Sequence, residues 1–213
     1  MKFFRHMLPG LCLIGVLLIG AGVPAHAQDI AAGEASYQIC QTCHGRRGEG
    51  IEALDAPDLA GQRDWYLVRQ LRNFKDGIRG ADRRDRLGEQ MAVFALTLPD
   101  DEAIRNVAAY IRTLPAAHAA PTLDGDPEQG QILYADCAPC HGDQAEGSLA
   151  SQAPRLNNRH DWYLLRQMRN FRFGIRGSHP MDIHGAQMMA LGSPFAFEAM
   201  MRDVIAYIKT LDQ

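Results

Sequence analysis

Two short segments of the same pattern carry the residues most able to do chemistry in this chain. They read CQTCH at 40–44 and CAPCH at 137–141. Two thiols three residues apart lie on one side of a helical turn, where each can add to a vinyl group of one haem, and the histidine that follows can then reach the iron. C-x-x-C-H is therefore the sequence mark of covalently attached haem c. The pattern predicts two haem c groups, attached at Cys40, Cys43, Cys137 and Cys140, with His44 and His141 as iron ligands.

Two other uses of paired cysteines fit the sequence less well. A thioredoxin-like redox pair belongs to a βαβ context, and neither segment follows a run of β-branched residues. A zinc site that used both pairs is also disfavoured, because the segments lie 97 positions apart and zinc modules space their ligands over far shorter stretches. We therefore expect haem iron rather than zinc or a reactive dithiol.

The second axial ligand of each iron separates an electron carrier from a haem that binds or transforms a substrate. Met91 and Met188 each follow the haem-binding histidine by 47 residues. A thioether is a soft, neutral ligand that favours ferrous iron. We therefore predict His/Met ligation of both irons, with the adjacent Met189 as the alternative in the second case. Ligation by two histidines, using His179 or His184, is less favoured because the first half of the chain has no histidine at the equivalent places.

These equivalences follow from a tandem duplication. A shift of 97 positions aligns 33–114 with 130–211 without an insertion, and 36 of the 82 aligned residues are identical. The longest shared stretch reads DWYLVRQLRNF at 64–74 and DWYLLRQMRNF at 161–171, and both copies continue into Gly-Ile-Arg-Gly. Repetition at a fixed period is the signature of a repeated structural unit. Each part of a site in one copy should therefore have its equivalent 97 residues away.

Helical periodicity positions these residues. Leu67, Leu71 and Phe74 mark one apolar face of a helix that we expect to end at Gly77, or at Gly174 in the second copy. Further helices are expected at 105–114 and 202–211, and a short helix should carry each C-x-x-C-H. No alternating strand pattern occurs. The predicted fold class is therefore all-α, with two tandem units that each wrap around one haem.

Prolines and unit size outline the domains. We expect a first domain at 28–114, a linker at 115–127 with three prolines and no periodicity, and a second domain at 128–213. A unit of about 85 residues is small for a self-sufficient apolar core. Covalent haem should therefore supply part of the surface that each unit buries.

The segment 1–27 reads as a signal peptide. Lys2 and Arg5 precede an apolar run at 11–23, and the A-x-A pattern that ends at Ala27 predicts cleavage there and export to the periplasm. A retained membrane anchor is the alternative, disfavoured by Pro24 and the glycines of the run. Removing the segment takes the basic residues from 22 to 20 against 25 acidic ones, a balance that argues against nucleic acid as a partner. The densest basic cluster, which we expect on a solvated loop, is Arg79, Arg83, Arg84 and Arg86.

With these motifs in order, the chain resembles the dihaem cytochromes c of the cytochrome c4 type, which contain two class I cytochrome c domains in tandem. The shared features are C-x-x-C-H, a Pro-x-Leu segment, Tyr-Leu-x-x-Gln-x-x-x-Phe-x-x-Gly-x-Arg, a loop methionine and a final helix with Ala-Tyr-Ile. The resemblance covers essentially the whole predicted mature chain. It implies that Pro57 and Pro154 present their backbone carbonyl groups to the Nδ1 protons of His44 and His141, which fixes each ring.

Together these features predict a protein that moves electrons and is not an enzyme. We expect a periplasmic dihaem cytochrome that carries single electrons from a membrane donor to a terminal oxidase or reductase. Its partners would be redox proteins, with peripheral contact to the membrane and neither nucleic acid nor a small-molecule substrate. The alternatives are an electron-transfer subunit of a dehydrogenase complex and, with less support, a dihaem peroxidase, which needs an iron with an open position.

Overall fold

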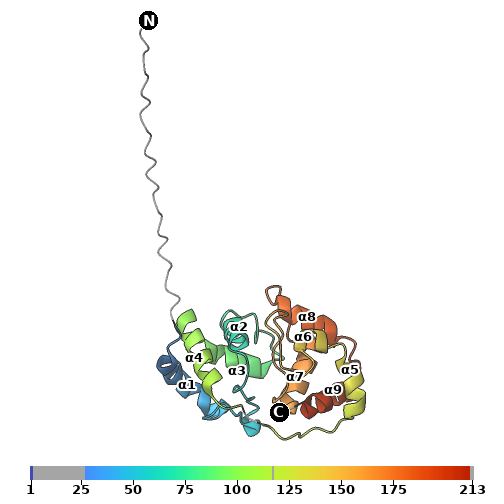
Figure 1. Ribbon diagram of the computed structural model, residues 1–213. Helices are drawn as coiled ribbons and strands as arrows, with labels where there is room; N and C mark the ends of the chain where they lie inside the picture. Colours follow the sequence, from blue (N-terminus) through green and yellow to red (C-terminus); the bar gives the residue numbers. More distant parts are fainter. Residues whose placement is uncertain (2–26, 117, 212–213) are drawn as a thin grey trace.

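The computed structural model describes residues 1, 27–116 and 118–211, and within these the chain is helical and forms no β-strand apart from two isolated bridges. The prediction of an all-α fold is confirmed. Two helical units lie side by side, with α1 to α4 in one and α5 to α9 in the other (Figure 1). Apart from its two ends, the predicted signal peptide lies outside the described residues. None of the described helices is both long and apolar enough to cross a membrane.

The first unit packs its described helices around a small core. They are α1 (Ile30–His44), α2 (Asp64–Lys75), α3 (Arg86–Ala95) and α4 (Asp101–Thr113), with the short 3-10 helix η1 (Glu52–Leu54) after α1. α1 packs against α4, and α2 packs against both α3 and α4. Ile104, Val107 and Ile111 share one face of α4 because of their spacing, and they are almost fully buried together with Tyr37 of α1.

The second unit repeats this arrangement 97 residues later. α5 (Pro127–Tyr134) and α6 (Ala138–His141) take the place of α1. α7 (Asp161–Arg172), α8 (Ile183–Gly192) and α9 (Glu198–Thr210) take the places of α2, α3 and α4. α5 packs against α9, and α7 packs against α8 and α9. The core again comes from the last helix, through Met201, Val204, Ile205 and Ile208.

One proline makes the opening helices of the two copies different. α1 runs unbroken for 15 residues through its C-x-x-C-H, whereas the second copy is interrupted between Tyr134 and Ala138. Pro139 stands where the first copy has Thr42. Because proline has no N–H to donate to the preceding turn, the helix stops and restarts with Pro139 in a first turn, where proline is tolerated. The expected short helix is therefore present as α6, while α1 is longer than predicted.

Each opening helix crosses the last helix of its unit at a glycine. Gly33 of α1 lies so close to the backbone of Asn106 in α4 that a Cβ atom would overlap the Asn106 carbonyl oxygen. Gly130 of α5 meets Asp203 of α9 in the same way. Since only glycine lacks a Cβ, these two positions allow the close crossing. The crossing holds each C-x-x-C-H segment against the core of its unit.

Several predicted boundaries are corrected by the structure. The methionines expected in loops lie in helices, Met91 in α3 and Met188 in α8. The last helices begin four residues earlier than predicted, at Asp101 and Glu198. The predicted linker at 115–127 extends one residue into α5, because Pro127 is already helical at a place where a missing N–H leaves no bond unmade.

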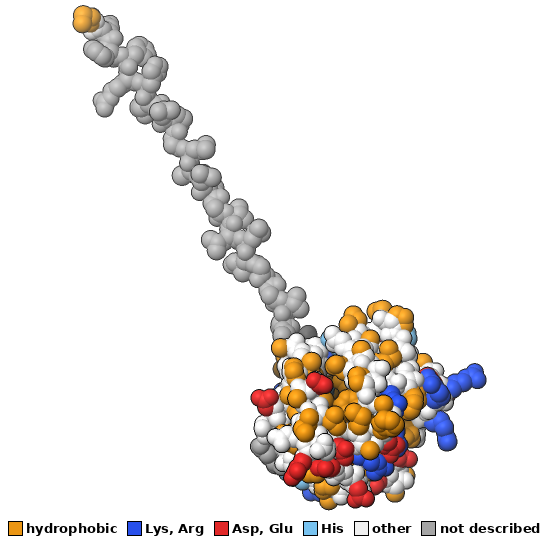
Figure 2. Space-filling view, turned by 90° about the vertical axis from the view of Figure 1, so that its right-hand side faces the viewer, with side chains coloured by type: hydrophobic (Ala, Val, Ile, Leu, Met, Phe, Trp, Pro, Cys, Tyr) orange, Lys and Arg blue, Asp and Glu red, His pale blue; other side chains and the backbone are white. Residues whose placement is uncertain are grey.

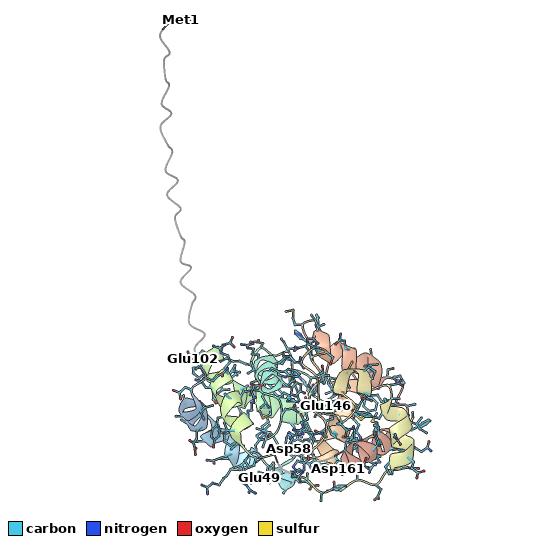
Figure 3. All side chains as sticks on the ribbon, viewed as in Figure 1. Met1, Glu49, Asp58, Glu102, Glu146 and Asp161 are labelled. Carbon is cyan, nitrogen blue, oxygen red and sulfur yellow. The ribbon has the colours of Figure 1, made fainter. Side chains whose placement is uncertain are left out.

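The two units meet in an interface where equivalent positions pair with each other. Asp58 forms an ion pair with Arg159, with Oδ2 and Nη1 2.5 Å apart, and both side chains are almost completely buried. Figure 3 shows Asp58 where the two units meet. The positions 97 residues away also pair, since Gln62 donates its amide to the carbonyl oxygen of Arg155 at 3.0 Å. The pairing is close to two-fold symmetric, but only one side of it contains this buried ion pair.

The surfaces of the two units differ. Figure 2 looks onto the second unit, where hydrophobic side chains gather over the visible face. Its exposed apolar residues include Phe173, Met181 and Ile183, which stand where the first unit has charged residues. The expectation of a solvated basic cluster is wrong for Arg79, whose side chain is buried and bonds to residues of the second unit.

Candidate functional site

The cysteines and histidines of the two C-x-x-C-H segments border two largely apolar cavities. Cys40, Cys43 and His44 border a cavity of about 410 Å³ in the first unit, and Met91 borders the same cavity. The second cavity, of about 310 Å³, is bordered by the equivalent Cys137, Cys140, His141 and Met188. No disulfide joins the described cysteines. Apolar cavities of this size with a few polar groups are typical of cofactor sites.

A proline carbonyl group holds each histidine ring. Nδ1 of His44 lies 2.7 Å from the carbonyl oxygen of Pro57, and Nδ1 of His141 lies 2.8 Å from that of Pro154. A carbonyl oxygen can only accept, so Nδ1 carries the proton and Nε2 keeps its lone pair for a metal. The contact that the family resemblance implies is present in both units.

A tyrosine fixes the chain just after each histidine. Tyr37 donates its hydroxyl to the carbonyl oxygen of Gly45 at 2.8 Å, and Tyr134 donates to that of Gly142 at 2.7 Å. Both glycines have positive φ, which lets the chain turn sharply where the helix ends. Burial raises the pKa of both tyrosine hydroxyls well above the usual range, so they remain donors at neutral pH. The backbone at each histidine is thereby anchored to the opening helix.

Burial also sets the protonation of the candidate ligands. It lowers the pKa of His44 and of His141, which favours the neutral imidazole that binds metals. It raises the pKa of Cys40 and of Cys137 to about 11, so neither thiol ionises at neutral pH. A reactive dithiol depends on an ionised thiol, whereas a thioether bond to haem leaves the sulfur uncharged. These environments therefore fit covalent haem better than a reactive dithiol.

The methionines come from different helices than the histidines. An aspartate side chain caps the start of both α3 and α8 by accepting a backbone N–H bond at 2.9 Å. Met91 and Met188 follow in these helices and border the two cavities. Met189 does not border the second cavity, and its sulfur lies beside Gly174 instead. This placement favours Met188 over Met189 as the methionine that faces the second cofactor.

Each cavity is completed by side chains of the other unit. The first cavity is also bordered by Arg159, Tyr163, Arg166 and Gln167 of the second unit. The second cavity is also bordered by the equivalent Gln62, Tyr66, Arg69 and Gln70 of the first unit. Two cofactors bound in these cavities would therefore share one wall of side chains.

Two buried arginines in this shared wall form no ion pair with a carboxylate within 27–116 and 118–211. Arg79 donates to Gln70 of its own unit and to Tyr163 and Gln167 of the other, and Arg176 makes the equivalent bonds. The Nε atom of each is buried and has no hydrogen-bond partner in the part of the chain that the structure describes. A buried guanidinium without an anion is costly. Haem carries two propionate carboxylates, with which Arg79 in the first cavity and Arg176 in the second would pair, so the residues present fit this cofactor.

The sequence alone does not predict the roles of these arginines. One feature could have indicated that they are functional: Gly-Ile-Arg-Gly is identical in the two copies, while the loop residues after it differ. The positive charges of the two arginines also change the pKa of a neighbouring tyrosine. Burial alone would raise the pKa of Tyr66, yet the positive charges of Arg176 and Arg79 hold it below its usual value.

Comparison with known proteins identifies the family. The family model of cytochrome c matches residues 30–115 and 127–212. The cytochrome c4 of Thiocapsa roseopersicina is 33% identical over 166 residues, which cover 71% of this chain and 79% of that protein. The chain belongs to the cytochrome c4 family. It is thus a dihaem electron-transfer cytochrome with two haem c groups.

Further relatives of this cytochrome agree with the fold and extend the comparison. The solved structure of Acidithiobacillus ferrooxidans cytochrome c4 matches with a TM-score of 0.63 and 27% identity, covering 80% of this chain and 98% of that one. A protein of Thiomonas intermedia named as a thiosulfate dehydrogenase electron acceptor is 28% identical over 192 residues, covering 84% of this chain and 83% of that protein.

Proposed function

We propose that this cytochrome is a periplasmic electron carrier, not an enzyme, which passes single electrons from a membrane donor complex to a terminal oxidase or reductase. The observation that carries the proposal is the matched pair of donor sets on cavities that share one wall, His44 with Met91 and His141 with Met188. When bound, haem supplies the one-electron iron couple.

The donor sets favour electron transfer over catalysis at the metal. His44 with Met91, and His141 with Met188, would hold the iron of each bound haem through two protein ligands and so leave no open position for a substrate. The neutral methionine sulfur stabilises ferrous iron and so raises the reduction potential. Pro57 and Pro154 hold the imidazole rings in one orientation. These residues therefore favour a change of iron charge without a change of ligands, as a carrier requires.

The shared wall supports electron exchange within the chain. Gln70 accepts hydrogen bonds from both Arg79 and Arg176 at 2.8 Å, and Gln167 accepts from the same two arginines at 3.0 and 2.9 Å. This closed network ties each cavity to the other. We expect an electron that enters through one unit to leave through the other.

The periplasmic location rests on the sequence of the segment 1–27 and its predicted cleavage after Ala27. Haem c attachment outside the cytoplasmic membrane of bacteria is consistent with such an export step. Mass spectrometry of the protein from a periplasmic fraction tests this. The expected mature chain begins at Gln28, and a chain that keeps its first residues in the membrane fraction would contradict it.

A second candidate function is that of an electron-accepting subunit for a dehydrogenase. The observation that favours it is the likeness to the thiosulfate dehydrogenase electron acceptor of Thiomonas intermedia, which extends over most of both chains. In that case the cytochrome would receive electrons from one catalytic partner rather than from a membrane donor. The two cavities and their histidine and methionine ligands would bind haem in the same way for this function.

Oxidation of the reduced holoprotein by membranes of its own host separates the two functions. We expect oxidation that saturates with protein concentration and stops when cyanide blocks the terminal oxidase. In gel filtration of the periplasmic fraction the cytochrome should elute by itself. Failure of the membranes to oxidise it, together with stable co-elution with a dehydrogenase subunit, would replace the carrier function with the second candidate.

A further inference from the structure

We propose that His184 is a reserve ligand for the iron of the second unit, which binds the metal when the sulfur of Met188 is lost or displaced. The first unit has no such residue. This inference rests on the proposed assignment of His141 and Met188 to the second haem.

His184 and Met188 border the same cavity and belong to the same helix, α8. They are four residues apart, and residues at this spacing lie on one face of a helix, one turn from each other. Bringing His184 to the position of Met188 therefore takes a shift of α8 by one turn, about 6 Å along its axis.

One ring nitrogen of His184 is left without a partner in the described structure. This nitrogen, Nδ1, is buried, and no hydrogen-bond partner for it occurs among residues 27–116 and 118–211. Leaving a buried polar nitrogen unpaired is unfavourable. Neutral imidazole is a strong ligand for haem iron, so binding would satisfy a group that the protein otherwise leaves unsatisfied.

The helix that carries both residues is less constrained at its end than its equivalent. In α3 the N–H of the capping residue Leu96 donates to the carbonyl oxygens of Ala92 and Phe94. At the equivalent Ser193 after α8, no such cap hydrogen bond is present in the described structure. Gly192, which has no side chain to pack, replaces Ala95 of α3. A helix with a freer end can adjust more easily to bring His184 to the iron.

The first unit serves as a control for this inference, because it repeats the second unit without the histidine. Leu87 stands at the place of His184 and borders the first cavity, together with Met91. The histidine side chains that border the two cavities thus match except at this one position. Exchange of the axial ligand in the second unit would break the iron–sulfur bond and form an iron–nitrogen bond, with no change in electron count. The result is a six-coordinate iron with two histidine ligands and a lower reduction potential.

A pair of matched substitutions in the holoprotein tests the inference by spectroscopy. Met91→Ala should leave one iron per chain high-spin, because Leu87 has no donor atom. Met188→Ala should lose one methionine–iron band yet keep both irons low-spin, since His184 takes the vacant position. In Met188→Ala combined with His184→Leu, one iron should become high-spin. Absorption and EPR spectra at neutral pH record all three, and retention of two haems per chain shows that each variant is intact. Should Met188→Ala disturb folding, Met188→Leu keeps the side-chain volume and removes the donor.

Three outcomes would overturn the inference. One is a high-spin iron in Met188→Ala equal to that of Met91→Ala. Another is a low-spin iron that persists in the double variant, which would assign the reserve ligand to another residue. The third is a Met188→Ala spectrum that retains both methionine–iron bands, which would make Met189 the ligand. The spectrum of the unmodified protein tests the proposed function, and the spectra of the variants test this inference. An absence of methionine ligation in the unmodified protein would contradict the carrier assignment itself.

Discussion

A chain in which Cys40 and Cys43 are both replaced by alanine is expected to lose the first haem and, with it, the folded first unit. The reason is the size of the cavity that haem would leave. With about 24 cal/mol for each Å³ of cavity, the 410 Å³ of the first unit correspond to roughly 10 kcal/mol. That is comparable to the whole stability of a small domain, about 5–15 kcal/mol. Haem-bound iron content and hydrogen exchange of α1 to α4 measure the effect.

The matched control is the same change in the second unit, Cys137 and Cys140 to alanine. Its cavity of about 310 Å³ corresponds to roughly 7 kcal/mol, so the loss should be of the same kind and somewhat smaller. In each variant the other unit should keep its haem. A haem-free first unit whose amides remain as protected as in the unmodified protein would show that haem is not part of its core.

Replacing Asp58 by asparagine is expected to destabilise the holoprotein by about 3–5 kcal/mol, because it leaves the buried guanidinium of Arg159 without its counter-charge. Asparagine is close to aspartate in shape, so the charge is the main change. Asp58 also accepts the backbone N–H of His160 at 3.1 Å, which ties the loss to the junction of the two units. The midpoint of urea unfolding, read from the haem absorption, gives the difference in free energy of unfolding.

The equivalent contact on the other side of the interface, between Gln62 and the backbone of Arg155, involves no ion pair and provides the control. Gln62→Ala removes the hydrogen bonds to the backbone of Arg155 but no charge, so about 1 kcal/mol should be lost. Exchanging both charged partners for apolar residues, as Asp58→Leu with Arg159→Met, should recover most of the stability. Equal losses of unfolding free energy in Asp58→Asn and Gln62→Ala would contradict this prediction, because the buried ion pair would then stabilise the interface no more than the neutral hydrogen bonds do.

Much of each unit could be predicted because its signals are local. The apolar faces of α2 and α7 and the C-x-x-C-H segments depend on residues close together in the sequence. The register that aligns Met91 with Met188 depends instead on the repeat of the whole unit after 97 residues. α8 has no clear apolar stripe, whereas α3 is as amphipathic as α2 and could have been predicted. The capping residues Asp85 and Asp182 were a further local signal for the start of both helices.

The contacts between the units could not be predicted from one sequence. Nothing local distinguishes a buried Arg79 from an arginine on a solvated loop, because its partners Tyr163 and Gln167 are more than 80 residues away. The same holds for the buried pair of Asp58 and Arg159. The sequence alone therefore indicates two separate haem domains, whereas each cavity is completed by side chains of the other unit.

Stepwise reduction of the oxidised holoprotein, followed by absorption and EPR spectroscopy, tests most directly whether both irons are carriers bound by histidine and methionine. Two electrons per chain should be taken up in one-electron steps, both irons should be low-spin throughout, and the weak methionine–iron band at the red edge of the oxidised spectrum should disappear in proportion to the electrons added. A high-spin iron in the unmodified protein, or a band that accounts for only one of the two haems, would contradict this.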